Sequence, residues 1–359
     1  MRPLDHDAIK HSYAVHAVPI PAMTGIVPLE TSPQVGDLAL AEVVELGRHT
    51  TLETRQGVST SLFPGDRLLV AFGNRYATDQ YEGYVPRRPL GACDLLSIGG
   101  VCGDVASMHD AMTSPTRLRL LGSVCDLAAR PLNLRSFALP LPSAEPLERP
   151  EVLLVVGASM NSGKTTTVGT LARALSRAGN RVAALKVTGT AAGKDGRFFA
   201  SSGARPVLDF TDAGYPSTYL LELDELLIVY RTLLAYARAA GPEYVVIEIA
   251  DGIFQRETRM LLESSVLHDT VDHVFFAAND SLSAESGVRA LRLAGLPVRA
   301  TAGMVTRSPL ATREAEAATD LPCLSVERMM SGEIPPLLRP AAAISVAGSD
   351  AVDAPAQAA

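Results

Sequence analysis

The chain has 359 residues, of which 47% are hydrophobic and 20% charged, so it can bury a sizeable core and is long enough for two domains. Its formal net charge of −7 disfavours nucleic acid as a partner, because neutralising phosphates requires clustered cations. No apolar run reaches the roughly eighteen residues of a membrane span, and the first residues lack the order of a signal peptide. We therefore expect a cytoplasmic protein with no membrane partner.

The four cysteines form no C-x-x-C pair, and most lie in apolar or glycine-rich surroundings. Small free thiols commonly fill protein cores, which favours buried thiols over a metal site. These cysteines are Cys93, Cys102, Cys125 and Cys323.

Short apolar stretches alternate with turn signals over residues 34–90, as in GDLALAEVVELG and PGDRLLVAFGN. Period-two alternation of this kind is typical of antiparallel strands. The later segment LRLLGSVCDL has the composition of a further strand. We predict a small all-β domain, a barrel or a sandwich, over residues 1–138.

A proline-rich segment over residues 139–150 predicts a linker, since few of its residues can continue a helix or a strand. At the other end, residues 340–359 are rich in small residues and weakly patterned, which predicts a disordered tail.

Strands and helices alternate over residues 151–339. EVLLVVG is a continuous apolar run of the kind expected for a parallel strand that is buried on both faces, and helical spacing follows it. RVAALKV, YVVIEIADG, HVFFAAND and VRATAGMVT have the composition of further buried strands. The pattern predicts an α/β fold with a mostly parallel, doubly wound sheet, whose ligands lie beyond the carboxyl ends of the strands.

A glycine-rich loop joins the first of these strands to the first helix and matches the Walker A pattern of P-loop proteins, with alanine at the usual first glycine. Backbone N–H groups of such a loop converge on an anion, and the helix dipole adds partial positive charge. We therefore predict that nucleoside triphosphate phosphates bind here. The predicted binding residues are Gly157, Ala158, Ser159, Met160, Asn161, Ser162, Gly163, Lys164, Thr165 and Thr166.

Within this loop, Lys164 is the predicted catalytic contact to the β- and γ-phosphates, and the Thr165 hydroxyl is the predicted Mg²⁺ ligand. Only four of the 32 basic residues are lysines, and Lys164, Lys186 and Lys194 lie in two neighbouring loops of the predicted domain. A compact ammonium suits a phosphate site better than a broad guanidinium does.

Over residues 151–330 the chain resembles P-loop proteins of the SIMIBI class, notably dethiobiotin synthetase and the molybdopterin-guanine dinucleotide biosynthesis protein B. In the synthetase family, the second strand ends in a lysine followed by a short Thr/Ser-Gly loop that faces phosphates and substrate. Lys186, Thr188, Gly189 and Thr190 stand at the equivalent place. The chain departs from that family by lacking the proline after the lysine and by a shorter spacing to the glycine.

The same resemblance places a carboxylate at the end of YVVIEIADG, where Glu248 or Asp251 would hold Mg²⁺ directly or through water. Glu248 follows an apolar run, where an unpaired carboxylate is costly, so we expect it to face a cation or a metal. Asp251 has the alternative of capping the next segment.

Two polar stretches follow later strands and supply further candidates. Asp195 is a candidate second Mg²⁺ carboxylate beside Lys194, a candidate substrate residue, and Thr211 and Asp212 are candidate acceptor contacts. Turn formation explains these compositions nearly as well. Thr306 lies where proteins of this class contact the nucleotide base.

The resemblance implies an ATP- and Mg²⁺-dependent enzyme that activates a small carboxylate or oxyanion, with Lys164, Lys186 and Glu248 as catalytic residues. The alternative is an NTPase whose nucleotide switches its contacts with a partner. A kinase acting on nucleic-acid ends is less favoured, because the chain is acidic and has no basic run. The N-terminal domain has three open roles, namely substrate binding, assembly of a homodimer, and covering of the active site. No guanine-binding signature is present, which favours ATP over GTP.

Overall fold

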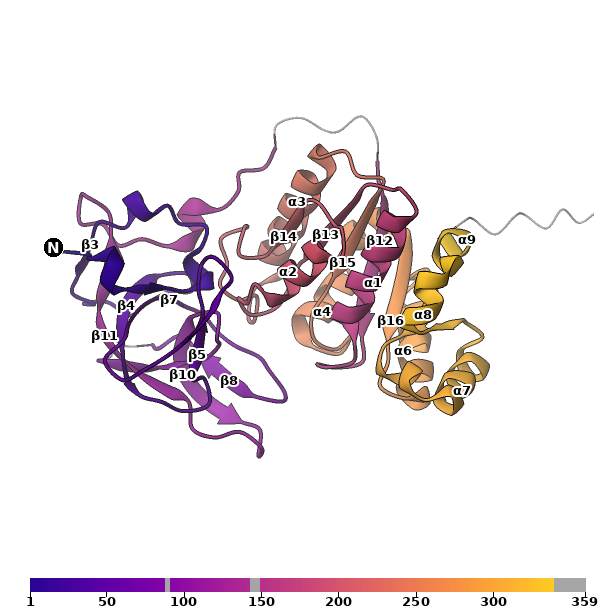
Figure 1. Cartoon of the computed structure of the whole chain (residues 1–359), viewed down its shortest axis with the longest axis horizontal. Helices are drawn as coiled ribbons and strands as arrows, with labels where there is room; N and C mark the ends of the chain where they lie inside the picture. Colours follow the sequence, from indigo (N-terminus) through magenta and orange to yellow (C-terminus); the bar gives the residue numbers. More distant parts are fainter. Residues whose placement is uncertain (88–90, 143–148, 339–359) are drawn as a thin grey trace, which may run out of the picture.

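A computed structural model describes residues 1–87, 91–142 and 149–338. The strands form two main sheets, one within residues 2–125, called here the β region, and one within residues 151–338, called the α/β region. The two regions lie side by side (Figure 1). The predicted linker falls only partly within the described residues, and the predicted tail at residues 340–359 falls outside them.

Among its described residues the β region holds eleven strands, most of which pair in an antiparallel manner, as their alternation predicted. Strand β9 pairs with both β10 and β11, so that β4, β7, β10, β9 and β11 form a closed ring. Of the two predicted alternatives, the pairing is therefore that of a small barrel. The strands are β1 (Arg2–Pro3), β2 (Lys10–His11), β3 (Gly25–Val27), β4 (Leu38–Glu45), β5 (Thr51–Glu53), β6 (Ser59–Ser61), β7 (Arg67–Phe72), β8 (Tyr81–Tyr84), β9 (Ala92–Leu95), β10 (Val101–Met108) and β11 (Thr116–Cys125).

Successive side chains of β4 point to opposite faces of the strand, and this alternation explains how the barrel is packed. Ala39, Ala41 and Val43 belong to one apolar cluster with Phe72 and Leu118, whereas Leu38 and Leu40 belong to a second cluster with residues from the first 26 positions. Short 3₁₀ helices connect the strands at His6–Ala8, Tyr13–Val15, Ile20–Ala22 and Leu134–Phe137. All four cysteines are buried and free, as their surroundings predicted.

The α/β region contains a seven-stranded sheet, and every pairing in it is parallel. The strand order is β14-β13-β15-β12-β16-β17-β18, which places β15 between β12 and β13. The strands are β12 (Glu151–Gly157), β13 (Val182–Lys186), β14 (Val207–Asp209), β15 (Tyr244–Glu248), β16 (His273–Ala277), β17 (Val298–Ala302) and β18 (Cys323–Leu324). The predicted parallel sheet is therefore confirmed.

Helices cover both faces of this sheet (Figure 1). Leu153 and Val155 of β12 pack with α1 (Lys164–Arg177), α2 (Lys194–Ser201) and α9 (Ile334–Leu338), while Val152, Leu154 and Val156 pack on the opposite side. That side carries α3 (Leu223–Ala239), α4 (Arg256–Leu262), α5 (Ser265–Thr270), α6 (Ser281–Leu293) and α7 (Pro309–Thr319). The remaining elements are a 3₁₀ helix at Met304–Arg307, α8 (Val326–Arg328) and a π-helical turn at Met329–Glu333.

None of the helices in the described ranges is long and apolar enough to cross a membrane.

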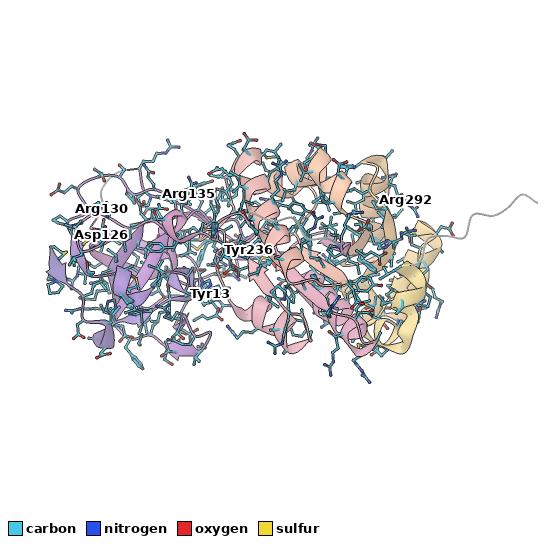
Figure 2. All side chains as sticks on the ribbon, turned by 90° about the horizontal axis from the view of Figure 1, so that it is seen from above. Tyr13, Asp126, Arg130, Arg135, Tyr236 and Arg292 are labelled. Atoms are coloured by element: carbon cyan, nitrogen blue, oxygen red, sulfur yellow. The ribbon has the colours of Figure 1, made fainter. Side chains whose placement is uncertain are left out.

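Polar contacts join the two regions. The Tyr13 hydroxyl, whose residue is labelled in Figure 2, donates to Asp209 Oδ2 at 2.8 Å. Glu53 is only 3% exposed; it accepts a hydrogen bond from Gly193 N at 2.8 Å and forms an ion pair with Arg197. These bonds connect the β region to the segment of the α/β region around α2.

We expect Glu53→Ala to lower the free energy of unfolding by about 2 kcal/mol, because it leaves the Gly193 N–H without its acceptor and removes the partner of Arg197. Urea denaturation followed by circular dichroism measures the change. The control is Glu42→Ala, whose pair with the exposed Arg119 lies within the β region and is expected to cost less than about 1 kcal/mol. Equal losses in the two variants would show that Glu53 does not stabilise the junction.

Candidate functional site

The strand register brings charged side chains into one row at the carboxyl edge of the parallel sheet. Lys186 at the end of β13 stands opposite Glu248 on β15 and opposite Asp209 on β14. Because β15 also pairs with β12, this row lies next to the loop that follows Gly157. The sheet thus gathers these side chains at the edge where the sequence predicted a ligand to lie.

The phosphate loop runs from the end of β12 at Gly157 to the start of α1 at Lys164. Gly163 has φ of 103°, and a Cβ there would lie 2.8 Å from Gly303 Cα, so only glycine fits without strain. The loop therefore delivers the free N–H groups and positive dipole end of α1 to the cavity beside it.

Lys164 is 6% exposed, and its ammonium donates to Ser159 O at 2.7 Å. Burial lowers the pKa of Lys164 from its ordinary value, while Glu248 and Asp251 oppose that shift. No ion pair with a carboxylate holds this ammonium in the described residues, so it is suited to an anionic ligand.

A cavity of about 520 Å³ lies against this loop. Residues of both regions surround it. The lining residues are Arg75, Tyr76, Ala77, Met160, Asn161, Gly163, Lys164, Thr165, Thr166, Lys186, Gly189, Thr190, Asp195, Glu248, Ala250, Asp251 and Met304. The structure thus brings together most of the residues that the sequence predicted for nucleotide, metal and substrate.

Lys186 is held between two carboxylates. Its ammonium forms an ion pair with Asp195 and lies 3.5 Å from Glu248 Oε1. Burial opposes the charge on Lys186, but Glu248 and Asp195 outweigh it, so its pKa is raised above the ordinary value. The ammonium therefore stays charged across the physiological range.

Oxygen donors that could hold a Mg²⁺ ion line the cavity. Glu248 is 2% exposed, and its Oε2 has no hydrogen-bond partner among the described residues. Thr165 and Asp251 line the same space, whereas the carboxylate of Asp195 is engaged by Lys186. Over the described ranges, no group of three or more His, Cys, Asp or Glu forms a protein-only metal site. Mg²⁺ rarely needs one, since it keeps waters and shares phosphate oxygens.

Several predicted residues lie outside this cavity. Lys194 is exposed at the start of α2, and the Thr306 hydroxyl donates to Gly303 O at 2.8 Å. The buried Thr211 donates both its N–H and its hydroxyl to Asp209. Thr211 therefore stabilises a turn, which was the alternative to an acceptor contact. The Thr188 hydroxyl accepts from Ala250 N at 2.7 Å. Gly157, Ala158, Ser159 and Ser162 belong to the loop without lining the cavity.

A second cavity of about 300 Å³ lies between the two regions and also has Lys186 in its wall. Tyr13, His16 and Arg55 line it from the β region, and Asp209 and Asp212 from the α/β region. Burial, followed by the charge of Asp212, raises the pKa of Asp209, while the contact with Asp212 raises that of His16 although burial opposes it. Lys186 therefore separates a phosphate-loop cavity from a polar cavity at the junction.

The sequence left covering of the active site open as one role of the N-terminal domain, but it did not identify the residues of the β region that line the cavity. Arg75, Tyr76 and Ala77 reach the phosphate-loop cavity, and the Asn161 amide of the phosphate loop donates to Asp79 Oδ2 at 2.5 Å. Asp79 and Asn161 are separated by 82 positions, and Asp79 belongs to no motif, so no local sequence pattern could have paired them.

No protein-family model and no curated protein matches the chain. Among solved structures, it is similar to the signal recognition particle 54 kDa protein from Aeropyrum pernix K1 in complex with GDP, with 22% identity and a TM-score of 0.36 over 57% of this chain and 52% of that one. The receptor FtsY from Elizabethkingia anophelis in complex with GDP has 18% identity and a TM-score of 0.34 over 52% of this chain and 61% of that one.

The kinase domain of Escherichia coli tyrosine kinase ETK matches with 16% identity and a TM-score of 0.33, over 42% of this chain and 66% of that chain. The chain thus spans between about half and two thirds of these three structures. The resemblance to dethiobiotin synthetase stays a sequence-based prediction.

We expect Lys186→Met to lower the free energy of unfolding by about 3 kcal/mol, because it leaves the buried Glu248 and its neighbour Asp195 without their cation. Adding Glu248→Gln should recover at least about 1 kcal/mol, since the more deeply buried charge is then removed as well. Urea denaturation of both single variants and the double variant measures this coupling. Strictly additive losses would contradict a shared buried charge cluster.

Proposed function

We propose that this chain is a Mg²⁺-dependent P-loop NTPase that uses ATP to activate a small carboxylate or oxyanion by phosphoryl transfer. Support for the nucleotide comes from the phosphate loop, the buried Lys164 without a carboxylate partner, and the orphaned oxygen of Glu248. Thr165, Glu248 and Asp251 would hold the Mg²⁺, which when bound would neutralise charge on the phosphates.

The position of Lys186 is the main observation that supports the transfer reaction. Its side chain lines both the phosphate-loop cavity and the cavity at the junction of the two regions. A charged ammonium at such a boundary can stabilise a phosphoryl group that passes from a donor on one side to an acceptor on the other. In the second cavity, Arg55 gives an anionic acceptor a cationic neighbour, while Asp209 and Asp212 line the same space and His16 lies 3.6 Å from Asp212 Oδ1.

A second candidate is an NTPase that switches its contacts with a partner. The hydrogen bond between Asn161 and Asp79 favours it, because the phosphate loop is then in direct contact with the β region. A ligand can shift such a contact only if it has different affinities for the two states. The second cavity and the clamped Lys186 favour the transfer reaction over the switch.

The first prediction from this proposal concerns Lys164. Lys164→Ala should weaken Mg²⁺-dependent ATP binding by about 10- to 100-fold, because a charge-assisted contact to phosphate contributes roughly 1.5–3 kcal/mol. Calorimetric titration with ATP and GTP measures the affinity, and phosphate release, with and without a metabolite pool, measures hydrolysis. Arg173→Ala, an exposed residue of the same helix α1, is the control and should bind like the wild type.

Hydrolysis that depends on Lys164 and rises with the pool supports transfer to an acceptor. Tight binding with slow hydrolysis that the pool does not change supports the switch. A folded wild-type protein that binds neither nucleotide would overturn the proposal.

The second prediction concerns Lys186. Lys186→Arg keeps the positive charge, but the broad guanidinium does not reproduce a compact ammonium between Asp195 and Glu248. We expect ATP affinity to change less than about threefold, while acceptor-dependent turnover falls about 100-fold, as loss of one transition-state contact does. Thermal melting confirms folding. Unchanged turnover in this variant would contradict a role for Lys186 in transfer.

A further inference from the structure

A buried arginine of the β region lies in the wall of the phosphate-loop cavity. Arg75 follows β7, and its backbone exchanges two hydrogen bonds with Gly83 of β8, Arg75 N to Gly83 O at 2.8 Å and Gly83 N to Arg75 O at 3.0 Å. This pairing fixes the backbone position from which the Arg75 side chain extends. Arg75 is 7% exposed and lines the cavity together with Lys164 and Thr165.

The guanidinium of Arg75 has only neutral hydrogen-bond partners among the described residues. Its Nη2 donates to Gln80 Oε1 at 2.6 Å, its Nη1 lies 3.4 Å from His49 Nε2, and its Nε is buried with no hydrogen-bond partner among the described residues. Burial, together with the charge of Arg75, lowers the pKa of His49 to about 4, so that imidazole is uncharged at neutral pH. Burial lowers the pKa of Arg75 itself only to about 10, so the guanidinium stays charged.

No carboxylate forms an ion pair with Arg75 in the part of the chain that the structure describes. A buried charge without a counterion is costly, and Arg75 also has an unused N–H donor. An anion in the cavity would supply the countercharge. This distinguishes Arg75 from the clamped Lys186, whose charge is already compensated by Asp195 and Glu248.

Arg75 lines the same cavity as Lys164, Lys186 and Asp251. Burial lowers the pKa of Arg75 and raises that of Asp251; the charge of Asp251 opposes the first shift, and the charges of Lys164 and Lys186 oppose the second. Arg75 therefore acts on the same space as the residues at the carboxyl ends of β12, β13 and β15. In a P-loop site this is the end that holds the terminal phosphate and its Mg²⁺.

The segment that carries Arg75 is also attached to the phosphate loop. Asp79 accepts from the Asn161 amide at 2.5 Å, and Gln80 holds the guanidinium. Tyr76 and Ala77 of the same segment line the cavity. Residues 75–80 thus position a cation and dock it against the loop that would cradle the phosphates.

We propose that Arg75 binds the terminal phosphate of a nucleoside triphosphate in this cavity, so that the β region completes the nucleotide site. The assignment rests on the proposed nucleotide function and adds a residue to it. The planar guanidinium can donate two parallel hydrogen bonds to phosphate oxygens, which a point charge cannot do. A nucleoside diphosphate lacks the group that Arg75 would contact, so Arg75 gives the site its preference for the triphosphate.

The test compares the full-length wild type with Arg75→Ala, Arg75→Lys and the control Arg67→Ala, which removes an exposed arginine of β7. Calorimetry with Mg²⁺ measures the affinity for ADP and GDP and for their non-hydrolysable imido triphosphate analogues. Arg75→Ala should weaken triphosphate binding at least tenfold and diphosphate binding less than threefold, and hydrolysis should fall in parallel with the lost contact. The lysine variant should be intermediate, and Arg67→Ala should match the wild type.

Rescue separates a contact to phosphate from a structural role. Guanidinium ion at millimolar concentration should partly restore hydrolysis to Arg75→Ala and leave the wild type unchanged. If the wild type binds nucleotide and Arg75→Ala keeps its triphosphate preference, the role of Arg75 is overturned and the nucleotide function stands. Equal losses for diphosphate and triphosphate with a lower melting temperature also overturn it. A folded wild type that binds no nucleotide overturns both.

Discussion

The buried ammonium of Lys186 is the interaction on which the site depends. Strand register places Lys186 opposite Glu248, and the first turn of α2 brings Asp195 to the same nitrogen. Two carboxylates could not lie so close in a largely buried place without a cation between them. The charge of Lys186 therefore links the parallel sheet to the start of α2 and lies at the boundary between the two cavities.

The β region gives this site its walls. Glu53 and Tyr13 join it to the segments around α2 and β14, and Asp79 joins it to the phosphate loop. These bonds hold the β region against the carboxyl edge of the sheet, where Arg75, Tyr76 and Ala77 form part of the cavity wall. Burial of charged side chains such as Arg75, Lys164 and Glu248 lowers the local dielectric and strengthens the interactions between their charges. A site built on the α/β region alone would lack the arginine and this part of the wall.

The sequence predicted those parts of the site that depend on local order along the chain. The phosphate loop and Glu248 each follow an apolar strand, and parallel strands end at the same edge, so their convergence could be expected. Arg75 could not be predicted, because its place depends on packing between segments far apart in the sequence. Lys194 failed to join the site because residues 194–201 form a helix, which turns Asp195 toward Lys186 and leaves Lys194 exposed.

The charges of the described cavity wall balance, since Arg75, Lys164 and Lys186 face Asp195, Glu248 and Asp251. A triphosphate entering alone would gain from the cations but would also meet the carboxylates at close range. A divalent cation changes this balance, because it is attracted to Glu248 and Asp251 and to the phosphates at once. Metal and nucleotide should therefore bind cooperatively, with Arg75 and Lys164 acting on the phosphate oxygens that the metal leaves free.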